Sequence, residues 1–272
     1  VTVATADTQV GSAGSTSASR QSYVTGGAVQ AACREVAAEV RRRAAQLTGA
    51  DPGDLELAGG KVVTRAGVPV ADLADLLGED TVERTVEWRH RPTTTLDPET
   101  GQGDAHVQFA FAAHRAVVDV DTELGLVTVV ALDCAQDVGR ALNPDQVLGQ
   151  IHGGSAQGLG LAVMEEIQVV DGLVRNPSFT DYLIPTILDM PPMRVEVLEL
   201  ADPNAPYGLR GVGEPPTLSS TPAIVAAIRD ATGAPIPHAD VWIHYSIADG
   251  PNDVSKGNRF WRPNRPGTEM RL

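Results

Sequence analysis

A stretch that is spaced like a helix but rich in glycine places the strongest limit on how this chain can fold. Residues 149–166 (GQIHGGSAQGLGLAVMEE) combine apolar side chains at helical spacing with Gly149, Gly153, Gly154, Gly158 and Gly160. Each glycine inside a helix costs about 0.5–1 kcal/mol relative to alanine. A helix tolerates that cost where a packed neighbour or a ligand must approach its backbone closely. We therefore expect such a contact here, with Gln150 and Gln157 as candidate polar groups directed into it.

Two known glycine-containing motifs do not fit this stretch. No Gly-Lys-Ser/Thr follows it, which excludes a P-loop. A nucleophile elbow is excluded as well, because Gln157 stands where that motif requires its second glycine after Ser155.

The composition excludes several classes of protein. The chain has 272 residues, 42% of them hydrophobic and 21% charged, as in a globular protein with a sizeable core. A net charge of −14 argues against binding to nucleic acid, which needs clustered lysine and arginine. Cys33 and Cys134 stand far apart, so a disulfide scaffold or a cysteine-ligated zinc or iron–sulfur site within this chain is excluded. With no apolar run of membrane-spanning length and no signal-peptide pattern, we expect a cytoplasmic protein without membrane contact.

Hydrophobic periodicity predicts an α/β fold of mixed sheets with packed helices. Helical spacing covers 26–48, 70–78 and 149–166. Alternation predicts strands over 1–8, short strands within 55–89, a hairpin at 116–133 and a strand over 193–200. We expect one domain over 1–245, divisible into subdomains 1–80 and 81–245, followed by a polar tail rich in proline and glycine over 246–272.

One carboxylate stands out near the end of the predicted domain. In GLRGVGEPP (208–216), Glu214 follows two glycines and precedes two prolines. Glycine permits tightly turned backbone and proline fixes φ, so this segment would hold a single side chain on a rigid loop. We expect a helix after it, capped by Ser220 or Thr221, with Pro222 in its first turn and its end at Gly233. Taken alone, the pattern fits a solvated glutamate better.

A second unusual loop is GSAGSTSASR (11–20), which is either a flexible linker or a cradle of hydroxyl and N–H donors for an anion. A well-formed helix follows it, which favours the cradle. Arg20, Arg140 and Arg210 lie in similar loops, where a guanidinium group can clamp a phosphate or carboxylate, although each alone fits a surface charge. From the residues alone, the loops 11–20, 149–158 and 208–216 could converge on an anionic ligand beside Glu214, but no reaction follows.

Four stretches of the chain resemble one known family. They are DTQVGSAGSTSASRQSYVTGGAV (7–29), DVGRALNPDQVLGQIHGGSAQGLGLAVMEE (137–166), NPSFTDYLIPTILDMP (176–191) and GVGEPP (211–216). Their order and spacing over roughly 1–233 are similar to the C-terminal part of the large subunit of the molybdenum hydroxylases, the xanthine dehydrogenase/aldehyde oxidase family. The sequences of two segments, 7–29 and HRPTTTLDPETGQGDAHVQFAFAAH (90–114), are most similar to bacterial xanthine dehydrogenase molybdenum subunits.

The resemblance implies a molybdopterin cofactor, in bacteria often its cytosine dinucleotide form, with molybdenum held through the pterin rather than by protein ligands. It places Glu214 on the family's catalytic glutamate and Gln150 on a glutamine that faces the cofactor. The loop that would bond the pterin and its phosphate comprises Thr16, Ser17, Ala18, Ser19 and Arg20.

The implied reaction is hydroxylation of an electron-poor carbon with oxygen from water, with a purine such as xanthine or hypoxanthine favoured over aldehydes, N-heterocycles and carbon monoxide. Electrons would leave through iron–sulfur clusters to FAD on partner chains. The family's upstream segments have no match in this chain. Either the large subunit is split between two polypeptides, with its N-terminal half as a further partner, or this chain is a fragment of a longer protein. The alternative is a non-catalytic molybdopterin-binding or assembly subunit.

Overall fold

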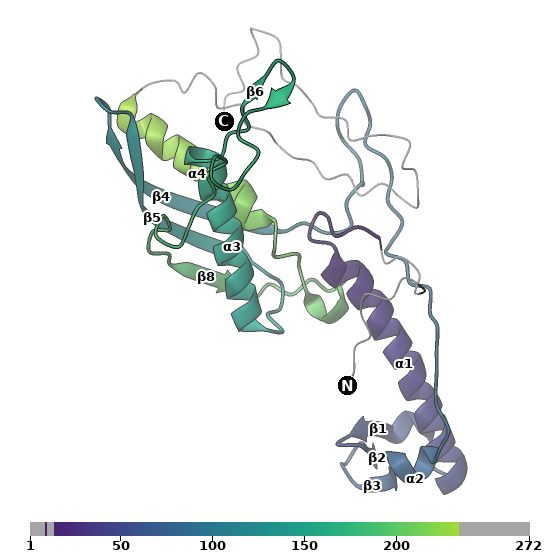
Figure 1. Cartoon of the computed structure of the whole chain (residues 1–272). Coiled ribbons are helices and arrows are strands. Elements are labelled where there is room, and N and C mark those ends of the chain that lie inside the picture. The colour runs from purple at the N-terminus through teal and green to yellow at the C-terminus, as the bar shows by residue number, and fades with distance from the viewer. Residues whose placement is uncertain (1–8, 10–13, 234–272) are drawn as a thin grey trace.

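The computed structural model describes Gln9 and residues 14–233, so the strand predicted for 1–8 and the tail predicted for 246–272 lie outside the described residues. The chain forms a mixed α/β structure in which a long helix, α1 (Gln21–Thr48), extends from a larger body to a small sheet at its far end (Figure 1). Helix α1 begins five residues before the helix predicted from residue 26 and ends at the predicted residue.

The small sheet packs on the C-terminal half of α1. It contains three antiparallel strands in the order β1-β2-β3, with bounds Leu55–Ala58, Lys61–Thr64 and Pro69–Asp72. A short 3-10 helix, η1 (Pro52–Asp54), leads into β1, and α2 (Leu73–Leu77) follows β3. The buried residues of this core are Val40, Ala44, Ala45, Leu55 and Val62. The short strands predicted around Gly59 and Gly60 are therefore confirmed. The helix predicted over 70–78 is shorter than expected, because β3 takes its first residues.

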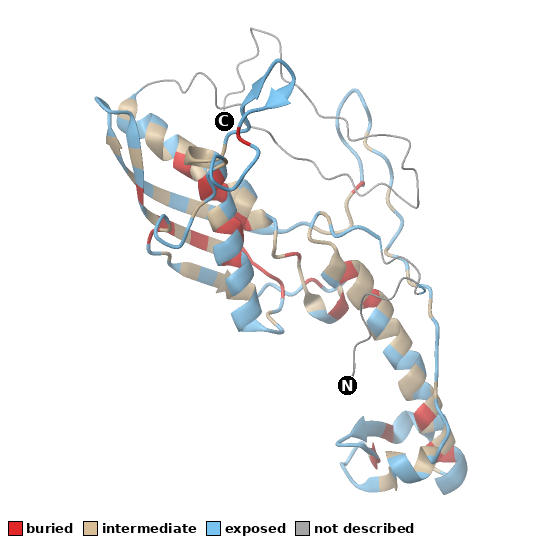
Figure 2. Cartoon of the chain, in the orientation of Figure 1, coloured by how far each residue is buried: buried red, intermediate tan, exposed pale blue. Residues whose placement is uncertain are grey.

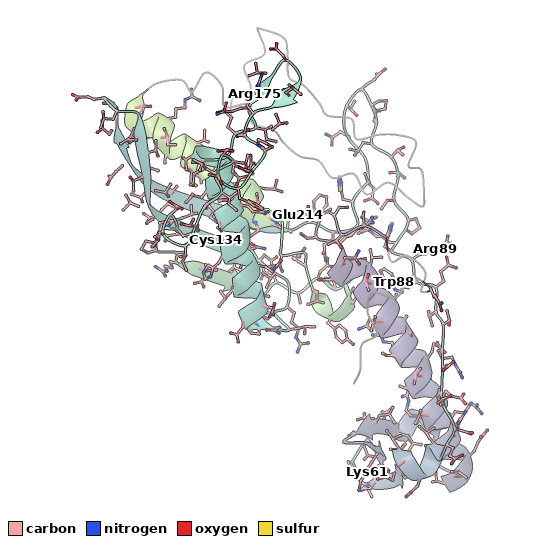
Figure 3. The ribbon with its side chains drawn as sticks, viewed as in Figure 1. Lys61, Trp88, Arg89, Cys134, Arg175 and Glu214 are labelled. Carbon is pink, nitrogen blue, oxygen red and sulfur yellow. The ribbon has the colours of Figure 1, made fainter. Side chains whose placement is uncertain are left out.

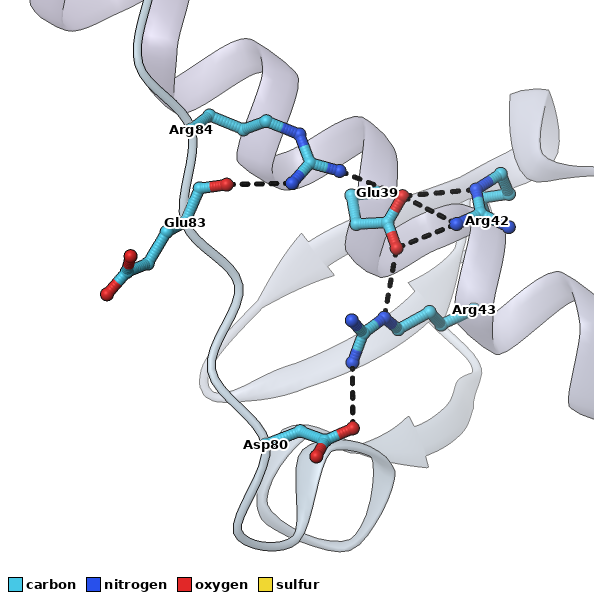
Figure 4. A network of polar contacts seen from close by, with 6 residues as sticks. All are labelled: Glu39, Arg42, Arg43, Asp80, Glu83 and Arg84. Atoms are coloured by element: carbon cyan, nitrogen blue, oxygen red, sulfur yellow. Dashed lines mark hydrogen bonds and ion pairs between the residues drawn. The ribbon is translucent and has the colours of Figure 1, made fainter.

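A network of ion pairs ties α1 to the chain that leaves the small sheet (Figure 4). Glu39 accepts hydrogen bonds from Arg42 and Arg43, and it pairs with Arg84 at 3.1 Å. The bonds from Arg42 and then Arg43 hold the pKa of the Glu39 carboxyl below its usual value. Arg43 also reaches Asp80. These contacts fix the start of the long segment that returns toward the larger body.

The larger body is built on a sheet of three strands in the order β4-β5-β8. Strands β4 (Phe111–Asp121) and β5 (Leu126–Asp137) form an antiparallel hairpin, which confirms the hairpin predicted at 116–133 and extends it at both ends. Strand β8 (Val195–Leu198) pairs with β5 in parallel and falls inside the strand predicted over 193–200. Side chains of β4 alternate between half-buried and exposed, so one face of the sheet is covered and the other is open (Figure 2).

Two helices, α3 (Pro144–Val163) and α4 (Pro215–Thr232), cover one face of this sheet (Figure 1). Their shared core with the sheet contains Val129, Leu132, Leu159 and Ile224. A two-stranded hairpin, β6 (Val169–Val170) and β7 (Leu173–Val174), follows α3, and the 3-10 helix η2 (Pro206–Gly208) precedes α4. In the part of the chain that the structure describes, no helix is long and apolar enough to cross a membrane.

The predicted start of the last helix is wrong. Helix α4 begins at Pro215, with Glu214 as its N-cap, so Ser220 and Thr221 lie inside the helix and Pro222 lies one turn further in than expected. Pro215 and Pro216 occupy the first turn, where the missing N–H of proline costs nothing. Its end is as predicted, with Gly233 in the left-handed conformation at the C-cap. Glu214 therefore belongs to the helix terminus and not to a separate loop.

Candidate functional site

Glu214 lies where the larger body meets the N-terminal end of α1 (Figure 3). It is the N-cap of α4, and its backbone oxygen accepts hydrogen bonds from the N–H groups of Thr217 and Leu218 at 3.1 and 3.3 Å. Its side chain is exposed within this chain. A helix N-terminus carries a partial positive charge, which attracts an anionic group. The geometry therefore presents one anionic group at a fixed place on the surface of this chain.

Two hydrogen bonds join Ser19 to Glu214, although 195 positions separate them in sequence. The Ser19 hydroxyl donates to Glu214 Oε2 at 3.1 Å. The Oγ of Ser19 also accepts a hydrogen bond from the Glu214 N–H at 3.0 Å. One hydroxyl thus fixes both the backbone and the carboxylate of Glu214. The serine-rich loop and the Gly-Val-Gly-Glu segment, predicted to converge, are brought together here.

The glycines of the Gly-Val-Gly-Glu segment make this approach possible. A Cβ at Gly211 would lie 2.7 Å from Ser19 Cβ and 2.9 Å from the Ser19 carbonyl oxygen, too close for any side chain. A Cβ at Gly213 would lie 3.1 Å from Gln150 Oε1 and 3.7 Å from Ser19 Oγ. Gln150, on α3, therefore lies beside Ser19 and Glu214, so all three loops of the sequence prediction contribute to one place.

Arg20 braces the serine-rich loop from inside. Its Nε donates to the Ser15 carbonyl oxygen at 3.0 Å and its Nη2 to the Ser15 hydroxyl at 3.1 Å. Gln21 donates to the same carbonyl at 3.0 Å. Arg20 therefore stabilises the conformation of this loop, and two of its guanidinium nitrogens already donate within the loop. Ser17 contacts Ser15 through their hydroxyls at 3.5 Å.

The other sequence candidates take different places. Thr16, Ser17 and Ala18 share the loop with Ser19, but none of the contacts within the described residues joins them to Glu214. Arg210 is not a free clamp, because it pairs with buried Asp137 at 2.9 Å and donates to the Phe109 carbonyl at 2.7 Å.

Arg140 is exposed. Thr217, on α4, donates to Gln157 Oε1 at 3.2 Å, so Gln157 serves the packing of α3 against α4 rather than a ligand.

A polar cluster around His114, which sequence patterns did not single out, contacts the first turns of α4. His114 of β4 contacts the hydroxyl of Ser219 through Nδ1 and that of Ser155 through Nε2, both at 2.9 Å. The Ser219 hydroxyl donates to the Pro215 carbonyl at 2.9 Å, so it accepts from His114. Nδ1 of His114 therefore carries a proton, and in the neutral imidazole Ser155 donates to Nε2.

Burial lowers the pKa of His114, which favours this neutral form. Strand alternation could have placed His114 on the covered face of the sheet, but its two serine partners come from other elements. Gln136, on β5, is the second missed residue: its Nε2 donates to the Val212 carbonyl at 3.1 Å. Gln136 thus reaches the backbone two residues before Glu214, whereas His114 is linked to the backbone after Glu214 through the Ser219 hydroxyl.

Comparison with known proteins identifies the family. Residues 1–191 match the model of a family described as the molybdopterin cofactor-binding domain. The chain belongs to this family, within the molybdenum hydroxylases. Glu214 lies beyond the matched residues, so its role depends on the motif and the geometry.

Individual proteins and solved structures of the molybdenum hydroxylases are also similar to this chain. The chain is 32% identical, over 233 residues, to the xanthine dehydrogenase molybdenum-binding subunit of Escherichia coli O157:H7, a match that covers 80% of this chain and 29% of that subunit. Quinoline 2-oxidoreductase from Pseudomonas putida 86 gives a TM-score of 0.64 at 29% identity, covering 79% of this chain and 28% of that one. Aldehyde oxidoreductase from Desulfovibrio gigas gives 0.64 at 28% identity, covering 82% and 22%. The chain thus spans less than a third of the length of these relatives.

The residues present fit a cofactor that carries a phosphate. Helix α1 has no side-chain cap and no acidic residue in its first turn, so its N-terminal N–H groups and its positive dipole end face the serine-rich loop without a counter-charge. Within the described residues, no hydrogen bond uses the backbone N–H groups of residues 15–19. The same residues contain no group of three or more His, Cys, Asp or Glu that could hold a metal ion directly.

Proposed function

We propose that this chain supplies the catalytic base and part of the cofactor-binding surface of a molybdenum hydroxylase. The observation that carries the proposal is the pair of hydrogen bonds between Ser19 and Glu214, since it joins the serine-rich loop to the only carboxylate of the Gly-Val-Gly-Glu segment. The overall reaction inserts oxygen from water: a substrate C–H bond becomes C–OH, and two electrons and two protons are released.

Glu214 is suited to accept one of those protons. Ser19 occupies its Oε2, whereas none of the hydrogen bonds of the described residues reaches its Oε1, which leaves this oxygen available. When bound, molybdopterin supplies the molybdenum that accepts the two electrons. Positioning a base to a fraction of an ångström is the task that the glycine- and proline-bounded segment performs.

The cofactor contacts that we propose are Thr16, Ser17, Ala18, Ser19, Arg20 and Gln150. Support comes from the backbone N–H groups of residues 15–19, which no hydrogen bond uses within the described residues, and from the start of α1, which has no side-chain cap. Such a combination suits the binding of an anion. A phosphate would bind there, and Gln150 would face the pterin from α3. We also propose the cytosine dinucleotide form of the cofactor, because the resemblance to bacterial members of the family implies it.

For the substrate we propose a purine, because relatives named as xanthine dehydrogenase subunits are among those at 32% identity over most of this chain. Aldehydes, N-heterocycles and carbon monoxide are the alternatives, and relatives named for nicotine hydroxylation and carbon monoxide oxidation match as well. The proposed partners are the N-terminal half of the molybdenum subunit and subunits that carry iron–sulfur clusters and FAD. The cytoplasmic location and the domain division at residue 80 stay predictions.

The test is Glu214→Gln in the complete enzyme that contains this chain. Gln keeps the shape of the side chain and can still accept from Ser19, but it cannot take up a proton at neutral pH. We expect turnover to fall at least about a hundredfold, the usual contribution of a general base. Molybdenum and pterin content should stay unchanged.

Glu166→Gln is the matched control, because Glu166 is an exposed glutamate at the end of α3. We expect it to leave turnover unchanged. Near-normal turnover of Glu214→Gln would refute the assignment of the base. Bound molybdopterin without any substrate-dependent dye reduction in the unmodified protein would favour the non-catalytic alternative.

A further inference from the structure

The side-chain amide of Gln136 makes a hydrogen bond through its nitrogen but, within the described residues, none through its oxygen. The side chain is completely buried, at 0% exposure, on strand β5. Its Nε2 donates to the Val212 carbonyl at 3.1 Å, whereas its Oε1 has no hydrogen-bond partner among the described residues. A buried acceptor without a donor lowers the stability of a protein, because it has lost its hydrogen bonds to water. The fold keeps Gln136 at that cost, which requires an explanation.

The backbone that carries this amide is among the most constrained in the larger body. Gln136 lies in the central strand, paired with Ala112 of β4 on one side and Val197 of β8 on the other. The next residue, Asp137, accepts from the N–H groups of Gly139 and Leu200 at 2.9 and 3.1 Å. The Nε2 of Gln136 is thus a donor fixed to the sheet.

The segment that receives this hydrogen bond is held by few other contacts of its backbone. The Val212 side chain packs against a small core cluster, but glycines stand on both sides of it, and glycine has the most freely rotating backbone. Upstream, the Arg210 N–H donates to the Val138 carbonyl, and downstream the Glu214 N–H donates to Ser19. Within the described residues, the bond from Gln136 is the hydrogen bond that holds the backbone between these two points.

We infer that Gln136 is a positioning residue for Glu214. Its amide fixes the Val212 carbonyl two residues before the carboxylate, while Ser19 fixes the carboxylate itself, so that the base is located from two sides. The inference rests on the proposed function of Glu214. It explains why an amide with an unpaired oxygen occupies a site where an apolar side chain of equal size would fit the core better.

The test is Gln136→Met in the complete, cofactor-loaded enzyme. Methionine has a similar volume, removes the unpaired oxygen and removes the donor to Val212. We expect kcat to fall about tenfold, which corresponds to ~1.4 kcal/mol, with KM within about twofold of normal. The thermal unfolding midpoint should stay the same or rise. Amide hydrogen exchange over residues 211–216, followed by mass spectrometry, should become faster.

Gln108→Met is the matched control. Gln108 also donates a partly buried side-chain hydrogen bond to this part of the chain, to the Leu209 carbonyl at 2.8 Å, and another to Asp202 at 2.8 Å. It leaves no unpaired oxygen in the core among the described residues, so its loss should lower the unfolding midpoint, while kcat stays within about twofold.

An unchanged kcat and unchanged exchange over 211–216 in Gln136→Met would overturn the inference. A lower unfolding midpoint without faster exchange there would also overturn it, because Gln136 would then act on stability alone. Where the Met variant does not fold, Gln136→Leu serves the same test. Failure of the proposed function is distinguishable: Glu214→Gln would then keep its turnover, whereas the exchange measurement reports the tether independently of turnover.

Discussion

Ser19 shows how the site depends on single residues in unfavourable conformations. Ser19 and the preceding Ala18 adopt φ angles of 50° and 52°, in the left-handed region that glycine occupies most easily. Such conformations cost about 1–3 kcal/mol each and concentrate at functional sites. Glycine would relieve the strain at Ser19 but would remove the hydroxyl that holds Glu214. The unfavourable backbone conformation at Ser19 thus accompanies the hydrogen bond from its hydroxyl to the Glu214 carboxylate.

His114 gives a prediction on the pH dependence of stability. Burial lowers its pKa in the folded protein below the ordinary value of 6.5, so the unfolded chain takes up the proton first as the pH falls. The contribution of His114 to stability is therefore complete above pH 6.5 and is lost as the pH falls from there toward the lowered pKa.

Thermal unfolding between pH 5 and 8 measures this effect. The His114→Asn variant, whose amide can still donate to Ser219, should lose this part of the pH dependence. An identical slope in both proteins would contradict the neutral assignment of His114.

Some residues of the site could be predicted from the sequence and one could not. The positions of Ser19, Gln150 and Glu214 in the resemblance predicted that they would meet, and the structure brings them together. Gln136 could not be found, because its role follows from a contact 76 positions away and from an oxygen left unpaired. Neither property leaves a mark in a local pattern of residue types.

At the scale of elements, the glycines of α3 are explained by a neighbouring helix. A Cβ at Gly158 would overlap the Ser220 hydroxyl and lie 3.1 Å from the Thr217 carbonyl. The hydroxyls of Thr217 and Thr221 donate to the Gly154 and Gly158 carbonyls at 2.9 and 3.0 Å. Helices α3 and α4 therefore meet backbone to backbone, and this close packing places Gln150 beside the start of α4.

The prediction at this scale concerns Gly158→Ala. The added methyl group should force α3 and α4 apart and destabilise the protein by about 1–3 kcal/mol, despite the gain in helix propensity. Gly153→Ala is the control on the same helix, because its Cβ would meet nothing within 4 Å. It should be neutral or stabilising by about 0.5–1 kcal/mol. Equal unfolding midpoints for the two variants would show that the helices do not pack as closely as described.

Element boundaries were predictable where local chemistry decided them. Asn143 accepts from the Gln146 N–H as the N-cap of α3, as expected for Asn-Pro at a helix start. The start of α4 could not be predicted in this way, because serine and threonine are preferred N-cap residues, which favours Ser220 and Thr221 over Glu214. Two prolines in the first turn and the hydrogen bonds from Ser19 to Glu214 override that preference. The competition is decided by tertiary contacts, which a local rule does not contain.

At the scale of the whole molecule, this chain presents one side of a site. Glu214 is exposed, and the chain spans 29% of the length of the xanthine dehydrogenase subunit that it matches. Large apolar side chains are also exposed along one segment after α3, namely Phe179, Leu183, Ile184, Ile187 and Leu188. Exposed apolar surface of this kind marks contact with other protein. We expect further protein to cover this segment and to enclose Glu214 in the complete enzyme.

A structure of the complete, cofactor-loaded enzyme would show directly whether Glu214 faces the cofactor. We expect the cofactor's phosphate against residues 15–20 and the start of α1, with the Glu214 carboxylate facing the molybdenum and still bonded to Ser19. A carboxylate that points into bulk solvent, with the pterin bound far from the serine-rich loop, would contradict it.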